Sequence, residues 1–559
     1  MKKTIALGLF TMLILSCGGG KYGVINKSGE YLIPPRFDEI WAFSENMAVV
    51  RTGEKFGYID SNGLLVVPPF YSMAASFSDG LAPVELSNRI LYIDKTGKVV
   101  ISGLFTEAYG FREGFAVIKE GMKYAYIDKK GNYLVKPFFL FADGFSDGLA
   151  LAGYPAEKTL GNIGGKMIFG YIDKTGKIAL SLNHLAREPK EIFTALLAKI
   201  ENVHLTVQGN PLLGKDKSLK SIIALMKSAD VSERQLCAWA LGEYKTSDGE
   251  RALTAGLTDT DPLVRFLSAW ALGQIRADDS VPALCALFKD PDKQVRLMAI
   301  RALSLIDGDL SLVPLTSLLQ DTDQDIRHCA QWAIQQLTVI KGGKFSEGKA
   351  VIQIGDLFGY IDRNGNIVIP PKYTEAYPYL NHHAIVKKGG KYGFVSLSGM
   401  PVGGFFFDKA LPFSGGVAVV QSNELYGMMN TNGVIVLKPS LDELFTQSEG
   451  LSVFAISNRF GYIDNNGQIV MKPILENAGT CVGGLAPVKG KGMYGYMDKS
   501  GQLKIPFAYE EAYPFKGGLA PVKSEGKWGY IDTNGLFIIP PVYIDAYPFT
   551  GLVAPVKGP

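Results

Sequence analysis

A seventeen-residue segment recurs at nearly fixed spacing, and this repeat limits the fold more than any other feature. The copy KWGYIDTNGLFIIPPVY (527–543) has close counterparts in KFGYIDSNGLLVVPPFY (55–71) and LFGYIDRNGNIVIPPKY (357–373). The copies lie 34 residues apart, except for one step of 45 and one of 189. Periods of this length are typical of chains that stack one small unit many times. Aligned on the second residue of the segment, the eleven copies begin at Tyr22, Phe56, Ile90, Tyr124, Phe169, Phe358, Tyr392, Tyr426, Phe460, Tyr494 and Trp528.

One unit predicts three short strands, at 518–523, 527–532 and 536–540 in the last copy. Alternation places Trp528 and Tyr530 on one face of the second strand. Gly529 lacks a side chain, so a neighbouring element can approach the backbone there. The proline pair Pro540-Pro541 is expected to end the third strand, where a missing N–H does little harm.

A glycine closes the turn between the second and third strands in every copy. Only glycine takes a positive φ without steric cost, so we expect a left-handed turn residue at each site. The turn sequence Asp-x-Asn-Gly offers one acidic residue where a calcium loop needs several, so no metal is expected. These repeat-structural glycines are Gly29, Gly63, Gly97, Gly131, Gly176, Gly365, Gly399, Gly433, Gly467, Gly501 and Gly535.

The aromatic-Gly core after Lys, the YID-x-x-G turn and the I-P-P exit resemble the WG (KWG) β-repeats of bacterial surface and secreted proteins. The resemblance covers 21–182 and 344–559. It implies a binding or scaffolding module without a shared activity. The fold class expected is a mainly β tandem-repeat array of about 11 units with an inserted all-α solenoid.

The two ends of the array carry partial units. After the expected signal segment, the mature chain opens at a second strand, Lys21-Tyr22-Gly23, and it ends after a first strand, Leu552–Lys557. The two parts sum to one unit, as in a propeller-like ring whose last strand completes the first blade. An open β superhelix also fits the repeat.

The long step between copies contains a second repeat, of 31 residues. Compared with one ordinary unit, 155 residues are inserted between Phe169 and Phe345. These helix pairs resemble short HEAT repeats of bacterial lyase-like and scaffold proteins, which implies that the regular Asp and Arg bridge adjacent repeats. The domains expected are 1–20 signal and tether, 21–183 β-repeats, 184–343 HEAT solenoid and 344–559 β-repeats. The recurring residues are Arg234, Arg265, Arg296 and Arg327, with Asp259, Asp290 and Asp321 as helix N-cap candidates.

The first twenty residues are typical of an export signal. Lys2 and Lys3 precede an apolar run at 5–15, which is too short to span a bilayer. The following Leu15-Ser16-Cys17-Gly18 resembles a bacterial lipoprotein signal, which implies that Cys17 is acylated and anchors the protein to a membrane. Gly18 is not the acidic residue that retains many lipoproteins at the inner membrane. We therefore expect a protein of the cell envelope, anchored in the outer membrane.

The remaining reactive residues form no recognised active site. Cys237, Cys285, Cys329 and Cys481 lack metal-binding spacing, and the five histidines show no HExxH pattern. Gly144–Gly148 matches the GxSxG elbow around Ser146, but the same place in another repeat holds Phe77-Ser78-Asp79-Gly80. No phosphate loop or dinucleotide motif is present. We expect no enzyme activity, no cofactor and no metal.

These patterns lead to a function hypothesis with one alternative. The net charge of +3, without a basic stripe in the helical block, argues against a nucleic-acid partner. We expect a non-catalytic lipoprotein that binds protein partners through the β-repeats and a groove of the HEAT block. The alternative is a carbohydrate or cell-wall binding module, which would need exposed aromatics such as Tyr58, Tyr360 and Tyr530 to stack on glycan rings.

Overall fold

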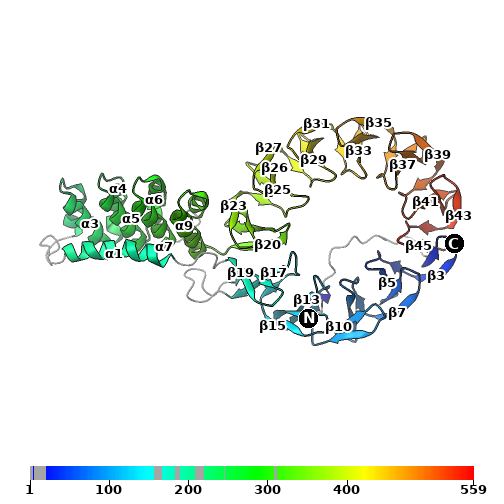
Figure 1. Cartoon of the computed structure of the whole chain (residues 1–559), viewed down its shortest axis with the longest axis horizontal. Helices are drawn as coiled ribbons and strands as arrows, with labels where there is room; N and C mark the ends of the chain where they lie inside the picture. Colours follow the sequence, from blue (N-terminus) through cyan, green and yellow to red (C-terminus); the bar gives the residue numbers. More distant parts are fainter. Residues whose placement is uncertain are drawn as a thin grey trace. The chain divides into compact units, whose positions relative to one another are not determined.

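The computed structural model describes residues 4–5, 20–155, 167–182, 189–207, 219–244, 246–306 and 311–558 (Figure 1). The chain forms two compact units. One comprises 1–150, 173–177 and 376–559, and the other comprises 151–172 and 178–375. The first holds β-repeats, and the second holds β-repeats and the helical block. None of the described helices has both the length and the apolar character needed to cross a membrane.

Each β-repeat is a four-stranded antiparallel sheet, not the three strands expected from the sequence. Sheets are built from four consecutive strands, from β4–β7 to β40–β43. The extra strand is a two-residue segment such as Glu39–Ile40, which follows the proline segment and pairs with the next strand. Two residues are too few to give an alternating pattern, so the sequence did not reveal it.

The strands before the helical block run from β1 to β19. The two-residue β1 (Thr4–Ile5) pairs in parallel with β12. The others are β2 (Tyr22–Asn26), β3 (Tyr31–Phe37), β4 (Glu39–Ile40), β5 (Met47–Thr52), β6 (Lys55–Asp60), β7 (Leu65–Tyr71), β8 (Met73–Ala74), β9 (Leu81–Leu86), β10 (Arg89–Asp94), β11 (Val99–Ser102), β12 (Glu107–Ala108), β13 (Phe115–Glu120), β14 (Lys123–Asp128), β15 (Tyr133–Phe139), β16 (Phe141–Ala142), β17 (Leu149–Pro155), β18 (Met167–Asp173) and β19 (Ile178–Ser181).

The strands after the helical block continue the same series. They are β20 (Lys341–Ser346), β21 (Lys349–Ile354), β22 (Leu357–Asp362), β23 (Ile367–Tyr373), β24 (Glu375–Ala376), β25 (His383–Lys388), β26 (Lys391–Ser396), β27 (Pro401–Phe407), β28 (Lys409–Ala410), β29 (Val417–Ser422), β30 (Leu425–Asn430), β31 (Ile435–Leu441), β32 (Glu443–Leu444), β33 (Leu451–Ile456), β34 (Arg459–Asp464), β35 (Ile469–Leu475), β36 (Asn477–Ala478), β37 (Leu485–Gly490), β38 (Met493–Asp498), β39 (Leu503–Tyr509), β40 (Glu511–Ala512), β41 (Ala520–Ser524), β42 (Lys527–Ile531), β43 (Phe537–Tyr543), β44 (Asp545–Ala546) and β45 (Val553–Lys557).

The last strand of the chain completes the first sheet. β45 pairs with β2, with Lys557 opposite Tyr22, in a sheet of order β3-β2-β45-β44. The hydroxyl of Tyr543 donates to the carbonyl of Gly29 over 3.1 Å, as Tyr509 does to Gly535 over 3.3 Å between sequential sheets. The pairing of the two partial units is therefore confirmed, and the end sheets contact as sequential neighbours do.

The proline pair lies inside the strand, so its expected position at the strand end is wrong. β43 continues through Pro540 and Pro541 to Tyr543. Trp528 pairs with Tyr543 but Tyr530 pairs with Ile539, so two extra residues bulge out of the ladder. The bulge lies against the glycine that most copies carry in the second strand: a Cβ on Gly529 would be 2.6 Å from the Ile539 carbonyl oxygen. The prolines are tolerated because residues in the bulge are outside the regular hydrogen-bond ladder.

All eleven turn glycines have a φ between 79° and 86°. In the copy at Asp60, one carboxylate oxygen accepts the N–H groups of Asn62 and Leu64, at 2.9 and 2.8 Å. The glycine N–H donates to the Asp60 carbonyl over 3.1 Å. The turn is thus fixed by backbone geometry and one local carboxylate.

Buried tyrosines join each sheet to the next. Tyr58 is fully buried, and its hydroxyl donates to the carbonyl of Ala75, 17 residues on, over 2.7 Å. Tyr171 makes the corresponding bond to Gly343 over 2.6 Å, although 172 residues separate the two. The separation of 172 residues exceeds the usual 17 by 155, which is the number of inserted residues. The helical block therefore interrupts the sequence of the β-array while the β18 and β20 sheets still contact each other.

A carboxylate on the turn before the first long strand also reaches the next sheet. Glu449 accepts the N–H groups of Gly483 and Gly484, at 2.7 and 3.0 Å, and pairs with Lys499 at 2.9 Å. Lys499 and the two N–H groups lower the pKa of Glu449 to about 2. Glu45 and Glu113 make the corresponding contacts in other repeats.

The contacts of Glu449 with Gly483, Gly484 and Lys499, which we call the Glu449 clasp, predict a specific acid sensitivity. A carboxylate with a depressed folded pKa stabilises the fold above its unfolded pKa and loses that contribution as pH falls through the folded value. We expect the stability of the wild type to fall between about pH 4.5 and 2 more steeply than that of Glu449→Gln, measured by urea unfolding at each pH. Glu525→Gln, whose side chain has no hydrogen-bond or ion-pair partner among the described residues, should follow the wild type. Equal slopes for all three proteins would contradict the role of the clasp.

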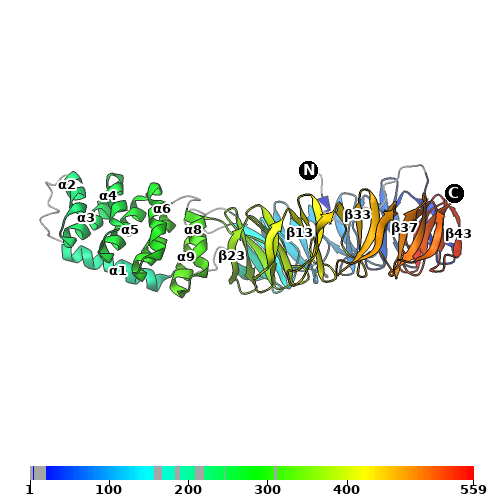
Figure 2. The ribbon, with the colours of Figure 1, turned by 90° about the horizontal axis from the view of Figure 1, so that it is seen from above.

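The helical block contains a stack of helix pairs and one additional helix. Helices α3, α5, α7 and α9 form one layer, and α2, α4, α6 and α8 lie on its other side from α1 (Figure 2). The helices are α1 (Lys190–Val207), α2 (Leu219–Ala224), α3 (Val231–Tyr244), α4 (Glu250–Gly256), α5 (Pro262–Ile275), α6 (Val281–Ala286), α7 (Lys293–Leu305), α8 (Leu312–Ser317) and α9 (Gln324–Leu337), with 3-10 turns η4 (Leu225–Lys227), η5 (Ser247–Gly249), η6 (Asp278–Ser280), η7 (Leu287–Lys289) and η9 (Leu318–Gln320).

Candidate interaction surfaces

Several sheets carry the same row of side chains across one face, because paired strands place residues in register. In β4–β7 the row is Glu39, Arg51, Phe56 and Tyr71. Arg51 Nη2 donates to Glu39 Oε1 over 2.6 Å, and this bond lowers the pKa of Glu39 below its ordinary value. We call this arrangement of acid, base and aromatic the acid–base row. It recurs as Glu107–Lys119–Tyr124, Glu511–Lys523–Trp528 and Asp545–Lys557–Tyr22.

In two of these rows the cation also lies over the aromatic ring, as Lys557 does over Tyr22 at 5.7 Å. Lys119 Nζ lies 4.9 Å from the ring centroid of Tyr124. A second aromatic follows the two-residue strand and packs on the row: the rings of Tyr513 and Trp528 stack at 5.3 Å. The charges are paired and the rings are covered, so a complete row has little free surface to offer a partner.

The acid–base row is incomplete in several sheets: Met73 pairs with Glu85 in β8–β11, and Lys341 pairs with Gln353 in β20–β23. Two neighbouring sheets, β28–β31 and β32–β35, are incomplete as well. In the first, Lys409 stands in the acid position and Gln421 in the base position. In the second, Ala455 stands opposite Glu443, where a base would be. Gln421 Nε2 donates to the backbone oxygen of Glu424 over 3.1 Å, so its amide is held by its own turn.

A cavity of about 330 Å³ opens where the row is broken. Leu411 and Phe445 stand in the positions that Trp41 and Tyr513 take in complete rows, but they are 41% and 48% exposed. We call this cavity the β28/β32 pocket. Its lining is Lys409, Ala410, Leu411, Val419, Val420, Gln421, Tyr426, Glu443, Leu444 and Phe445.

The β28/β32 pocket combines an apolar floor with two separated charges. Lys409 and Glu443 are exposed, and neither forms an ion pair with a described residue. The volume suits one or two side chains and is at the lower end for small-molecule sites. The described residues contain no group of three or more His, Cys, Asp or Glu that could hold a metal ion. The geometry suits binding of an apolar side chain.

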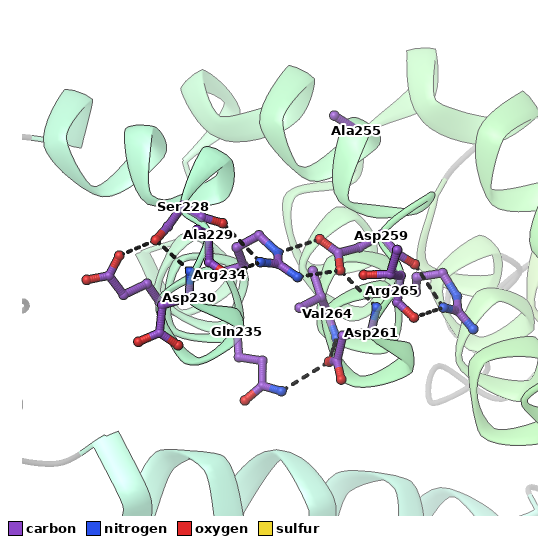
Figure 3. Close-up of polar contacts among 12 residues, drawn as sticks. Ser228, Ala229, Asp230, Arg234, Gln235, Ala255, Asp259, Asp261, Val264 and Arg265 are labelled. Carbon is purple, nitrogen blue, oxygen red and sulfur yellow. Dashed lines mark hydrogen bonds and ion pairs between the residues drawn. The ribbon is translucent and has the colours of Figure 1, made fainter.

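In the helical block, two arginines link successive helix pairs, and Figure 3 shows the first link, from Arg234 to Asp259. Arg234 Nε and Nη2 donate to the two oxygens of Asp259 over 2.7 and 3.1 Å, and Arg265 binds Asp290 in the same way over 2.7 and 2.9 Å. The Nη1 groups of Arg234, Arg265, Arg296 and Arg327 each donate to two backbone carbonyls five and six residues earlier. Arg296 forms no ion pair among the described residues.

The expected N-caps were placed two residues too early. The side chain of Asp261 caps α5 by accepting the Val264 N–H, with Pro262 at the first helical position. Asp292 and Asp323 cap α7 and α9 in the same way. Asp259, Asp290 and Asp321 are not N-caps. The carboxylates of Asp259 and Asp290 form ion pairs with Arg234 and Arg265. The backbone carbonyl of Asp321 accepts a hydrogen bond from Arg327.

Helix α1 covers part of the groove that we expected to receive an extended partner. The ring of Phe193 lies 4.9 Å from that of Trp332 on α9, and the guanidinium of Arg301 on α7 lies 4.8 Å from it. Lys199 Nζ donates to Gln294 Oε1 over 2.6 Å and lies over Phe266 at 5.2 Å. α1 therefore crosses α3, α5, α7 and α9 and does not extend the stack.

Comparison with protein families identifies the repeats. The model of the WG containing repeat matches more than half of the chain, at 22–56, 56–89, 92–124, 124–152, 358–392, 393–426, 426–458, 460–492, 494–528 and 528–557. The chain belongs to the WG-repeat family. The HEAT-repeat model matches 219–292 and 267–337, within the helical block of this WG-repeat protein. Both resemblances drawn from the sequence are confirmed.

No curated protein matches the chain. Among solved structures, a phycocyanin lyase complex from Nostoc is 30% identical over 20% of this chain and 44% of that chain, with a TM-score of 0.19. Human deoxyhypusine hydroxylase is 20% identical over 28% of this chain and 60% of that chain, with a TM-score of 0.22. The extracellular domain of a putative hybrid two-component system of B. thetaiotaomicron is 9% identical over 90% of this chain and 57% of that chain, with a TM-score of 0.20. The chain spans less than two thirds of each, and these likenesses carry no argument about function.

The aromatic residues proposed for glycan stacking are buried in the WG repeats. Tyr58, Tyr360 and Tyr530 have no exposed surface, so none can stack on a sugar ring. Burial raises the pKa of Tyr530 well above its ordinary value, and its hydroxyl donates to the Tyr547 carbonyl over 2.9 Å. These side chains join neighbouring sheets and do not support the carbohydrate alternative.

The other candidate residues fall in structural positions or outside the described residues. Ser146 lies in a two-residue bridge with Leu149, the same place that Ser78 takes with Leu81. Cys237, Cys285, Cys329 and Cys481 form no disulfide. Cys17, the expected acylation site, lies outside the described residues. The β28/β32 pocket was missed. Gln421 and Ala455 depart from the Lys or Arg of other copies, but Glu85 and Gln353 do so too, so this departure alone does not locate the pocket.

Proposed function

We propose that this WG-repeat protein is a non-catalytic scaffold that binds partner proteins and is held at the bacterial outer membrane by a lipid on Cys17. The observation that carries the scaffold function is the β28/β32 pocket. There, two adjacent sheets lack a complete acid–base row, and Leu411 and Phe445 are exposed. An apolar side chain of a partner would fill the pocket, with an acidic neighbour towards Lys409 and a basic one towards Glu443.

A photo-crosslinking residue in place of Phe445 tests the scaffold function in cells that make the protein naturally. We expect a discrete adduct with one partner protein. The same residue at Leu104, which is 84% exposed and lies outside the pocket, should give no such adduct. Leu411→Asp should lower the yield at least about tenfold, because it places a charge against an apolar contact. The same adduct from both positions, or none from position 445, would contradict the proposal.

The lipid anchor has a separate test. Cys17→Ala removes the thiol that would be acylated, and two or three acyl chains hold a protein on a membrane almost permanently. We expect the wild type to incorporate radiolabelled fatty acid and to sediment with membranes, and the variant to do neither. Cys481→Ala, a change at a buried thiol, is the matched control and should label as the wild type does. Membrane sedimentation of Cys17→Ala would contradict the anchor and leave the scaffold function unaffected.

A further inference from the structure

Helix α1 differs from the other long helices in how little of it is buried. Among residues 190–203, for which burial is described, only Phe193, Leu196 and Ile200 are buried. α5 buries nine of its 14 residues. The three buried side chains of α1 follow i, i+3, i+7 spacing, so one narrow face makes the contact. A helix held by so few side chains opens locally more readily than its neighbours.

The surface beneath α1 is shaped by a break in the HEAT pattern. α3, α5 and α9 carry Trp239, Trp270 and Trp332 at equivalent positions, while α7 carries Arg301 there. The ring of Phe193 contacts both Arg301 and Trp332. The arginine supplies a cation–π contact where a fourth tryptophan would stand.

A polar contact fixes the direction of the bound helix. Lys199, six residues after Phe193, reaches Gln294 on α7 and lies over Phe266 on α5. An aromatic at the α7–α9 end and a lysine at the α5 end therefore define both the register and the polarity of the helix. We call this surface, formed by Phe266, Gln294, Arg301 and Trp332, the helix-binding face.

We propose that the helix-binding face receives an amphipathic helix of a partner protein, which binds in exchange with α1. The partner helix carries an aromatic residue, aliphatic residues three and seven positions later, and a lysine at the sixth. This is the helix-in-groove mode of recognition, with α1 as the resident occupant. The inference extends the proposed scaffold function to a second surface, and its test does not involve the β28/β32 pocket.

The test uses a fluorescent peptide of residues 189–207 as the competing helix, with the full chain. The wild type should bind it weakly, because α1 occupies the face in most molecules. Phe193→Ala combined with Ile200→Ala weakens α1 in the chain, so the peptide should bind about tenfold tighter or more. Trp332→Ala should lose binding. Glu201→Gln, on the exposed side of α1, should match the wild type, and a scrambled peptide should not bind.

Hydrogen exchange on the wild type gives a second measurement that does not depend on the variants. With excess peptide, the amides of α1 should lose protection while those of α5, α7 and α9 keep theirs. Peptide binding without loss of protection in α1, or no gain in affinity for the Phe193→Ala/Ile200→Ala chain, would overturn the proposal. A concentration-dependent dimer of the wild type that is lost in Phe193→Ala would also overturn it, by assigning the face to α1 of a second copy.

Discussion

Gly57→Val is expected to destabilise the sheet β4–β7 by about 3 kcal/mol or more. A Cβ at position 57 would lie 2.3 Å from the Val67 carbonyl oxygen and 2.7 Å from the Pro69 nitrogen. Both atoms belong to the backbone of the proline bulge, so no side-chain rotation relieves the clash. Hydrogen exchange should show a loss of protection in β5, β6 and β7, and urea unfolding should give the free-energy change.

Two other repeats supply the controls for this prediction. Ala125 stands at the equivalent position in a sheet that keeps the bulge, so Gly57→Ala should cost clearly less than Gly57→Val. Leu91 stands there in a sheet whose third strand has no proline pair, and Leu91 pairs with Ser102 without a bulge at that step. Leu91→Val, at a position where the backbone already accommodates a Cβ, should therefore cost clearly less than Gly57→Val. Equal stability of Gly57→Val and the wild type would contradict the role given to the bulge.

Arg265→Met is expected to destabilise the helical block by about 3 kcal/mol or more. The change leaves the carboxylate of Asp290, whose side chain is 4% exposed, without its bidentate partner. It also removes the donor to the carbonyls of Asp259 and Thr260. Thermal unfolding followed by circular dichroism at 222 nm measures the loss.

Arg296→Met is the matched control for this change. Arg296 keeps the carbonyl contacts of the repeat but forms no ion pair among the described residues. Its replacement should cost clearly less, about 1.5 kcal/mol, because the guanidinium's hydrogen bonds to carbonyls are lost but no buried carboxylate loses a bidentate partner. Equal effects at the two positions would show that the carbonyl contacts, and not the ion pair with Asp290, connect the helix pairs.

The features predictable from the sequence are those that recur in every repeat. The turn glycines and the second strand are visible because each copy needs the same backbone geometry. The two-residue strands were missed because pairing with the next strand, and not local pattern, forms them. The helix N-caps were misplaced because the sequence Asp259-Thr260-Asp261-Pro262 offers two candidates. Pro262 at the first helical position was the signal that would have chosen Asp261.

The candidate surfaces depend on contacts that sequence spacing alone does not define. The position of α1 follows from contacts of Phe193 and Lys199 with residues 67 to 139 positions away, which no local pattern predicts. The β28/β32 pocket follows from two sheets that lack a base in their rows. Here the departures from the repeat, and not the repeat itself, shape the two candidate surfaces.

The account depends on the helical block being an insertion into one continuous series of β-repeats. Joining Leu182 to Thr338 removes residues 183–337, the 155 residues by which the Tyr171–Gly343 contact exceeds the usual 17-residue step. Hydrogen exchange of this shortened chain is the most direct test. We predict that β17, β18, β21 and β22 keep the protection that they have in the full chain. Loss of protection in all four strands would show that the β-repeats on the two sides of the helical block do not form one series.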